Sequence, residues 1–217
     1  MDKKDIDLGK LLASIDPEEV DHLLPEEQEK FKLLAEKFQE DELLAGAKKD
    51  FLSFVKLLWP HFVEGTHHRI IAEKFNRIAD GTLKRLIVNM PPRHTKSEFA
   101  SFMLPAFIMG RNPMTKIIQT SHTAELSQRF GRKTKQLIDS SEYKDIFPET
   151  GLQADSKAAG RWDTSEGGEY FAAGVGGAIT GRGADLLIID DPHSEQDALS
   201  ETAMENAYEW YTSGPRQ

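Results

Sequence analysis

The chain has no cysteine among its 217 residues, so it can form neither a disulfide framework nor a cysteine-based zinc site. Long apolar runs are also missing, and none approaches the roughly 18 residues that a membrane-spanning helix needs. The first five residues, Met1 to Asp5, are mostly charged and lack the apolar core of a signal peptide. With 39% hydrophobic and 29% charged residues, the composition predicts a soluble domain with a real core. Because neither a membrane span nor a signal peptide is recognised, a cytosolic protein is expected.

Negative charge outweighs positive charge, but unevenly along the chain. Residues 1–50 hold 15 acidic and 8 basic side chains, a net charge of −7, whereas the other 167 residues hold 21 and 19, a net charge of −2. An acidic chain does not suit a protein that coats nucleic acid through general electrostatic attraction. A motor that contacts DNA through a local basic patch is compatible with this balance.

Residues 1–47 form an acidic zone whose pattern predicts short amphipathic helices. Residues 16–19 combine a helix cap, a first-turn proline and two acids, and Pro25 opens a second helix with similar signals. Apolar residues then recur at helical spacing, at Phe31, Leu34 and Phe38. Two interpretations stay open: an arm that docks a partner protein, or a helical extension that packs on the core.

Beyond residue 47 the pattern alternates between strands and helices. Strands are expected at 86–89, 116–120, 169–173 and 186–189, and helices at 51–59, 68–79, 97–109, 123–140 and 197–211. Such alternation favours a parallel sheet with helices on both faces, so the predicted fold class is α/β. Ligands of these folds bind at the carboxyl ends of the strands.

Residues 85–98 carry the most informative pattern, an apolar run followed by a short loop and a Lys-Ser pair that opens a helix. Backbone N–H groups and a helix N-terminus can meet the phosphates of a nucleoside triphosphate there. Lys96 would reach the outer phosphate oxygens, and the Ser97 hydroxyl would bind Mg²⁺. A Lys-Ser pair after a strand is common, however, and does not by itself indicate a nucleotide site.

The loop departs from the general phosphate-binding pattern GxxxxGK(S/T). Met90 and Thr95 stand where that pattern has its two glycines. Two neighbouring features support the interpretation: Pro91 and Pro92 stiffen the loop, and Arg93 adds a fixed cation where phosphates would lie.

Residues 185–192 supply a second pattern, an apolar run that ends in two acids, Asp190 and Asp191. A strand of this form can deliver a metal-binding aspartate and a neighbouring catalytic acid. Alternatively, paired acids at a strand end form a helix cap or a surface turn. The acids follow the Lys-Ser pair in the order and at the spacing typical of nucleotide hydrolases, so the two patterns together favour that class.

These two stretches together resemble the ATPase part of the large terminase subunit of tailed bacteriophages, the motor that packages viral DNA. Residues 87–97 are similar to the family's deviant Walker A motif, commonly Pro-Pro-Arg-His-Gly-Lys-Ser, and Thr95 is the one departure within that core. Residues 181–192 resemble its Walker B motif and the segment before it. Weaker similarities occur at 59–68, 121–126 and 143–148.

The resemblance covers about residues 50–217 and implies a P-loop NTPase-type parallel sheet flanked by helices. The expected domains are an acidic helical arm at 1–47 and a P-loop ATPase domain at 48–217, incomplete at its C-terminus and without the family's nuclease domain. The implied cofactors are ATP and Mg²⁺. No nuclease activity is expected from this chain alone, because no further carboxylate cluster is visible.

The resemblance also assigns roles to the matching residues. Lys96 would contact the β- and γ-phosphates, while Ser97 and Asp190 would hold Mg²⁺. Arg93 would sense the phosphates. Asp191 would orient the attacking water, although it is one methylene shorter than the glutamate common at this position. Further nucleotide contacts are expected from Pro92, His94, Thr95 and His68.

Arg182 is the candidate for an arginine that acts on the ATP of a neighbouring subunit, with Arg161 as the runner-up. Alternatively, Arg182 is a turn residue paired with Asp185. His67 and His68 stand where the family recognises adenine, or else they are exposed histidines at a helix start.

The implied partners are double-stranded DNA, the portal protein and the small terminase subunit, with no membrane. The chain would be a monomer in isolation and a homo-oligomeric ring when docked on the procapsid in the host cell cytoplasm. Arg129, Arg132 and Lys133 share a helical face that could track DNA phosphates or simply face solvent. Two other functions stay open: a different P-loop nucleic-acid motor, such as a helicase-like ATPase, or an inert terminase fragment that acts as a docking module.

Overall fold

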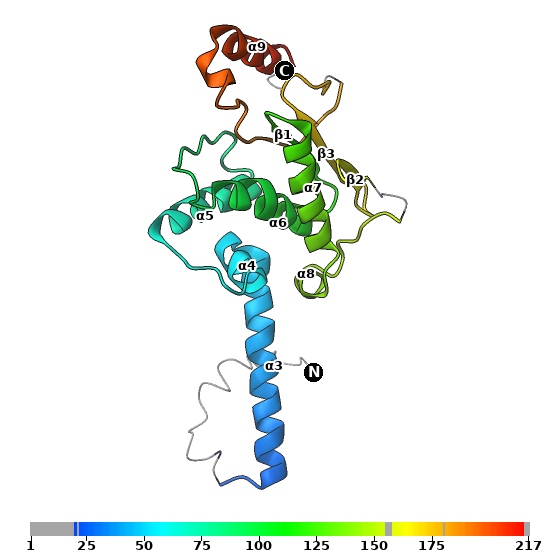
Figure 1. Cartoon of the computed structure of the whole chain (residues 1–217). Coiled ribbons are helices and arrows are strands. Elements are labelled where there is room, and N and C mark those ends of the chain that lie inside the picture. Colours follow the sequence, from blue (N-terminus) through cyan, green and yellow to red (C-terminus); the bar gives the residue numbers. More distant parts are fainter. Residues whose placement is uncertain (1–19, 21, 155–157, 180, 215–217) are drawn as a thin grey trace.

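The computed structural model describes residues 20, 22–154, 158–179 and 181–214, arranged as Figure 1 shows. Three helices come first: α3 (Pro25–Lys49), α4 (Phe51–Leu58) and α5 (Thr66–Ala79). The middle of the chain holds a π-helical segment η1 (Glu98–Met103), then α6 (Leu104–Arg111), α7 (Ala124–Ile138) and α8 (Ser141–Ile146). A 3₁₀ turn η2 (Asp197–Leu199) and α9 (Glu201–Ser213) come last.

One sheet contains four strands: β1 (Lys116–Ser121), β2 (Arg161–Asp163), β3 (Glu169–Gly174) and β4 (Leu186–Ile189). They lie in the order β2-β3-β1-β4, with β1 parallel to both of its neighbours and β2 antiparallel to β3. The predicted α/β class is confirmed at this level, as a mostly parallel sheet flanked by helices. The sequence does not predict β2, because three residues are too few to carry a periodic pattern.

The strand expected at 86–89 is not part of this sheet, so that prediction is wrong. The segment has no regular secondary structure, and none of the described strands pairs with it. Leu86, Val88 and Met90 pack partly buried against the main core, whereas Ile87 is 86% exposed. Packing one side of the segment on the core accounts for the alternation of buried and exposed residues, but a strand also needs a neighbouring backbone to pair with.

Within the described part of the acidic zone, the helix expected to open at Pro25 is one long helix, so the prediction that it is short is wrong. α3 runs without a break from Pro25 through Gly46 to Lys49, and the boundary expected at residue 47 falls inside it. In Figure 1 this helix projects from the rest of the molecule, and its C-terminal end lies against α4, α6 and α8. Packing there, where Ala47 is fully buried, offsets the roughly 1 kcal/mol that a glycine costs in a helix.

The helix start expected at 16–19 lies outside the described residues. Within the part of the chain that the structure does describe, no helix combines the length and hydrophobicity needed to cross a membrane.

The other expected elements are confirmed with shifts of a few residues. The helix expected at 97–109 begins at Lys96 and continues to Arg111, with η1 as a wider turn inside it. Pro105 follows this turn and has no N–H to donate to the carbonyl four residues earlier, at Ser101. The missing bond is a physical reason for the π-helical turn, a distortion that is frequent at functional sites.

The main core lies between one face of the sheet and helices α4 to α8. Phe51 stands at its centre, with ring centroids 5.2, 5.4 and 5.6 Å from those of Phe75, Phe99 and Phe107. On the other face, a smaller cluster around Ile118 packs with Trp210 of α9. Since Phe99 belongs to η1, the main core also fixes the helix that carries the Lys-Ser pair.

Candidate functional site

The loop before η1 holds two residues in the left-handed backbone region. Arg93 has a φ of 64° and Thr95 a φ of 62°. Branching at Cβ makes this conformation costly for threonine, whereas glycine adopts it freely. Thr95 therefore occupies a position whose geometry suits the glycine of the general phosphate-loop pattern. Strain of this kind beside a helix N-terminus is typical of functional loops.

Lys96 contacts both acids that follow β4. Its Nζ donates to Asp191 Oδ1 and lies 3.6 Å from Asp190 Oδ1. Partial burial disfavours the lysine charge, but the two carboxylates outweigh this effect and hold the pKa of Lys96 above its ordinary value. The fold thus brings the loop and the acidic strand end together across 95 residues of sequence.

Asp190 is buried, with 6% of its surface exposed. Its Oδ2 accepts a hydrogen bond of 2.9 Å from Ser101, a fully buried residue of η1. A buried carboxylate needs such a donor, because an unpaired buried charge is costly. The sequence analysis did not single out Ser101. Its position one helical turn after Ser97 is the signal that could have indicated it.

The loop, η1 and Asp191 surround a cavity of about 830 Å³, a volume within the range of small-ligand sites. Every residue from Met90 to Glu98 contributes to its lining, together with Trp59, Phe102 and Lys133. The expected phosphate-contacting residues of the loop, Pro92 to Ser97, are therefore all brought to one cavity.

These loop residues differ in their contacts. The His94 ring donates from Nδ1 to the Pro92 carbonyl oxygen at 2.9 Å, which stiffens the turn. Arg93 is exposed and forms no ion pair with any described residue. The Ser97 hydroxyl, half-buried at the cavity wall, is hydrogen-bonded to none of the described residues. Arg93 and Ser97 are therefore available to a ligand in the cavity.

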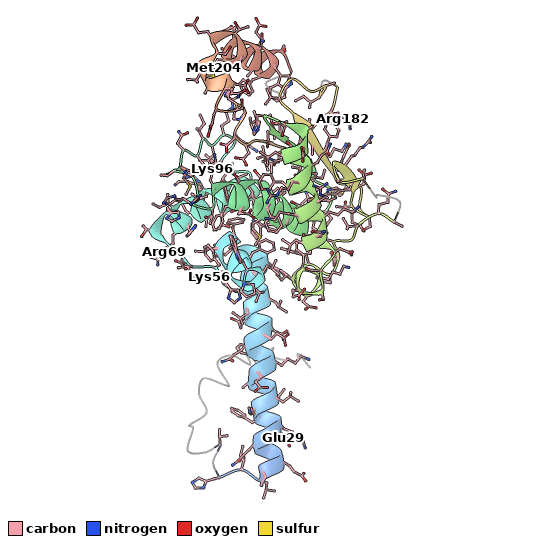
Figure 2. All side chains as sticks on the ribbon, in the orientation of Figure 1. Glu29, Lys56, Arg69, Lys96, Arg182 and Met204 are labelled. Atoms are coloured by element: carbon pink, nitrogen blue, oxygen red, sulfur yellow. The ribbon has the colours of Figure 1, made fainter. Side chains whose placement is uncertain are left out.

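Arg182 lies away from this cavity and from the loop lysine (Figure 2). Its Nη1 donates to Glu169 at 2.7 Å, and its guanidinium lies 4.0 Å from the centre of the Phe171 ring. Glu169 begins β3 at the amino ends of the parallel strands, roughly 16 Å of strand from their carboxyl ends. Arg161 pairs with the same glutamate at 3.2 Å. The alternative pairing with Asp185 is not formed, since that carboxylate accepts a backbone N–H of β1.

His68 is buried behind the loop and does not line the cavity. Its Nε2 lies 2.7 Å from Thr95 Oγ1, and its Nδ1 accepts the Gly65 N–H at 2.8 Å. Burial foremost, and then two neighbouring histidines, hold the pKa of His68 below its ordinary value, while Glu64 acts in the opposite direction. The structure therefore places His68 against the back of the loop.

The basic face expected on the helix after β1 is divided. Arg129 and Arg132 of α7 are exposed, whereas Lys133 pairs with Glu98 and lines the cavity. Of the three residues that share this helical face, two thus face solvent and one lines the candidate site.

No group of three or more His, Asp or Glu side chains within the described residues is arranged to hold a metal ion by itself. A Mg²⁺ ion that arrives with a nucleotide needs fewer protein ligands, since phosphates and water supply the others. Asp190 keeps one oxygen free of Ser101, and Ser97 lines the cavity. Carboxylate and hydroxyl oxygens of this kind suit a hard cation.

Comparisons with known proteins add no family assignment. Neither the protein-family models nor the curated proteins gave a match to this chain. Inferences about its function therefore rest on the motifs and on the geometry of the site.

Proposed function

We propose that this chain binds ATP with Mg²⁺ and hydrolyses it in the manner of P-loop nucleotide hydrolases. The observation that carries the proposal is the contact of Lys96 with Asp190 and Asp191, beside a cavity lined by the whole loop. This arrangement combines a cation for phosphates, a helix N-terminus and two carboxylates at the carboxyl end of β4, which is parallel to β1.

The proposed mechanism begins with phosphate capture at the start of the helix that carries η1. Backbone N–H groups of the loop and the Lys96 ammonium would neutralise phosphate charge, with Arg93 as a further cation. Lys96 would exchange its carboxylate partners for phosphate oxygens, which frees Asp191, whose side chain is 58% exposed. That carboxylate would then accept a hydrogen bond from the attacking water and orient it.

Ser97 and Asp190 are the residues that would hold Mg²⁺. The metal supplies charge neutralisation at the transferring phosphoryl group when it is bound. The hydrogen bond from Ser101 to Oδ2 keeps Asp190 oriented, with its other oxygen, Oδ1, 3.6 Å from Lys96 Nζ.

The terminase resemblance extends the proposal to a motor that drives double-stranded DNA into a procapsid. The chain would then work in the host cell cytoplasm, in a ring docked on a portal protein and supplied with DNA by a small terminase subunit. Arg129 and Arg132 would contribute phosphate contacts to DNA. Arg182 would reach a neighbouring subunit's ATP only after release from Glu169.

Two observations favour a second candidate, a catalytically inert docking module. Thr95 holds a costly backbone conformation in the loop, and the segment at 86–89 that leads into it pairs with no described strand. A loop unable to close around phosphates would leave Lys96 paired with Asp191. A helicase-like ATPase, the third candidate, would share the site and differ in its partners.

Mg²⁺-ATP binding measured by calorimetry, and turnover measured by phosphate release, test the proposal in the unmodified chain, Lys96→Ala and Asp190→Ala. We expect ATP affinity to fall about tenfold or more in Lys96→Ala, because a charge-assisted hydrogen bond contributes roughly 1.5–3 kcal/mol. Turnover should be lost in both variants. Lys144→Ala is the matched control, since Lys144 also pairs with an aspartate, Asp139, at 2.7 Å but does not line the cavity.

If the unmodified, folded chain binds no nucleotide, the proposal that it hydrolyses ATP is contradicted. The inert docking module is then the remaining candidate function. Dependence of turnover on a portal protein would separate the packaging motor from a helicase-like ATPase. Stimulation by DNA would not separate them, because both motors act on DNA.

A further inference from the structure

A chain of hydrogen bonds supports the loop from behind. The His68 ring accepts the Gly65 N–H at Nδ1, 2.8 Å away, and its Nε2 lies 2.7 Å from the Thr95 hydroxyl. That hydroxyl donates to the carbonyl oxygen of His94 at 2.6 Å. A hydroxyl has a single proton, so Thr95 must accept the bond that joins it to His68. His68 is therefore a neutral imidazole with its proton on Nε2.

The His68 ring is fixed on its remaining sides. Only 5% of the residue is exposed, and the ring centroid lies 4.8 Å from that of Phe62 and 5.0 Å from that of Phe99. Gly65 is the N-cap of α5 and His68 its third residue, so the bond at Nδ1 is also part of the helix start. A ring held at one nitrogen and by two aromatic neighbours offers Nε2 at a defined position.

His68 Nε2 lies beside the Thr95 hydroxyl, and Thr95 is the loop residue whose backbone conformation needs to be stabilised. A β-branched side chain at a φ of 62° is an outlier, and such conformations persist where surrounding contacts enforce them. The Thr95 hydroxyl accepts a hydrogen bond from His68 and donates one to the His94 carbonyl oxygen, and these two bonds hold the residue in this conformation.

We propose that His68 is a positioning residue that holds the phosphate loop in its left-handed turn through Thr95, and that it does not contact the base. The inference rests on the proposed nucleotide binding and names the residue that shapes the loop for phosphate. A His-Thr pair here replaces a loop glycine, which would adopt the same turn without support.

Affinities for Mg²⁺-ATP and for inorganic triphosphate, which has no base, test this in His68→Asn and His68→Gln. The glutamine amide can place a donor near the position of Nε2, whereas the asparagine amide replaces only the Nδ1 acceptor. Both variants lose the same ring packing, so each is the other's control. We expect His68→Asn to bind both ligands about tenfold more weakly, with most of the affinity kept in His68→Gln.

A rescue variant separates positioning from general damage to the fold. Thr95→Gly in the His68→Asn background should restore affinity for both ligands, because glycine needs no support in this turn. Loop contacts act on the ground state and the transition state alike, so KM should rise in His68→Asn while kcat changes little. If His68→Asn does not fold, Thr95→Val decides the question, since it removes the hydroxyl without disturbing the buried ring and should show the same tenfold loss.

Weaker ATP binding with unchanged triphosphate binding would overturn the inference in favour of a base contact. Equal losses in both His68 variants, not rescued by Thr95→Gly, would also overturn it. Unchanged affinity in every variant would contradict this inference alone. An unmodified chain that binds neither ligand would contradict both this inference and the proposed function.

Discussion

The two acids after β4 differ in how firmly they are held, although they are neighbours in sequence. Asp190 is buried and hydrogen-bonded to Ser101, whereas Asp191 is exposed and has a φ of 44°. Lys96 contacts both. If phosphates draw Lys96 away, Asp190 keeps its place and Asp191 can move. This difference suits a division of roles between a metal ligand and a group that orients water.

Ser101→Ala tests the support of Asp190. The change leaves a buried carboxylate oxygen without its hydroxyl donor, so we expect the free energy of unfolding in urea to fall by about 1–3 kcal/mol. Ser97→Ala is the matched control one turn away, and its loss should stay within about 0.5 kcal/mol because its hydroxyl bonds to none of the described residues. Equal losses in the two variants would contradict the assigned role of Ser101.

Between elements, Asp50 joins α4 to α5. Its carboxylate caps α4 by accepting the Ser53 N–H at 2.7 Å, and it also accepts from Asn76 of α5 at 2.7 Å. Burial disfavours its charge, but the hydrogen bonds from Ser53 and Asn76 outweigh burial and hold the pKa of Asp50 below its ordinary value. The charged form is therefore favoured by folding.

A group with a lowered folded pKa contributes stability that is complete above its unfolded pKa and is lost as the pH falls through the folded value. For Asp50 this places the loss below about pH 4. In Asp50→Asn, which keeps an acceptor for the α4 cap, the free energy of unfolding should depend less steeply on pH in that range. Urea titrations of both proteins at neutral and acidic pH measure this, and parallel pH profiles would contradict it.

Taken whole, the molecule is one packed body with a projecting helix (Figure 1). Phe51 of α4 holds several helices of this body together, because its ring contacts residues of α5, η1 and α6. Phe51→Ala should lower the free energy of unfolding by about 3–5 kcal/mol, the usual cost of truncating a buried phenylalanine. Leu34→Ala is the control on the projecting helix, where Leu34 is 53% exposed, and should cost less than about 0.5 kcal/mol. A comparable loss in both variants would mean that the part of α3 around Leu34 also packs into the core.

Local patterns were enough to predict the strands β1, β3 and β4, most helices, the loop that ends in Lys96 and the acids after β4. Each of these features depends on residues close in sequence: an apolar period, a cap or a turn residue. The same patterns could not tell a paired strand from the unpaired segment at 86–89, because pairing depends on a distant backbone.

Contacts between distant segments lay beyond any such pattern. The bond from Ser101 to Asp190 spans 89 residues, the bond from His68 to Thr95 spans 27, and Arg182 is held by Glu169 instead of the nearer Asp185. Local periodicity says which residues are buried or helical, but it carries no information about which polar groups meet. Partners for buried polar groups are chosen by the packing of whole elements, since each such group must find a donor or an acceptor inside the fold.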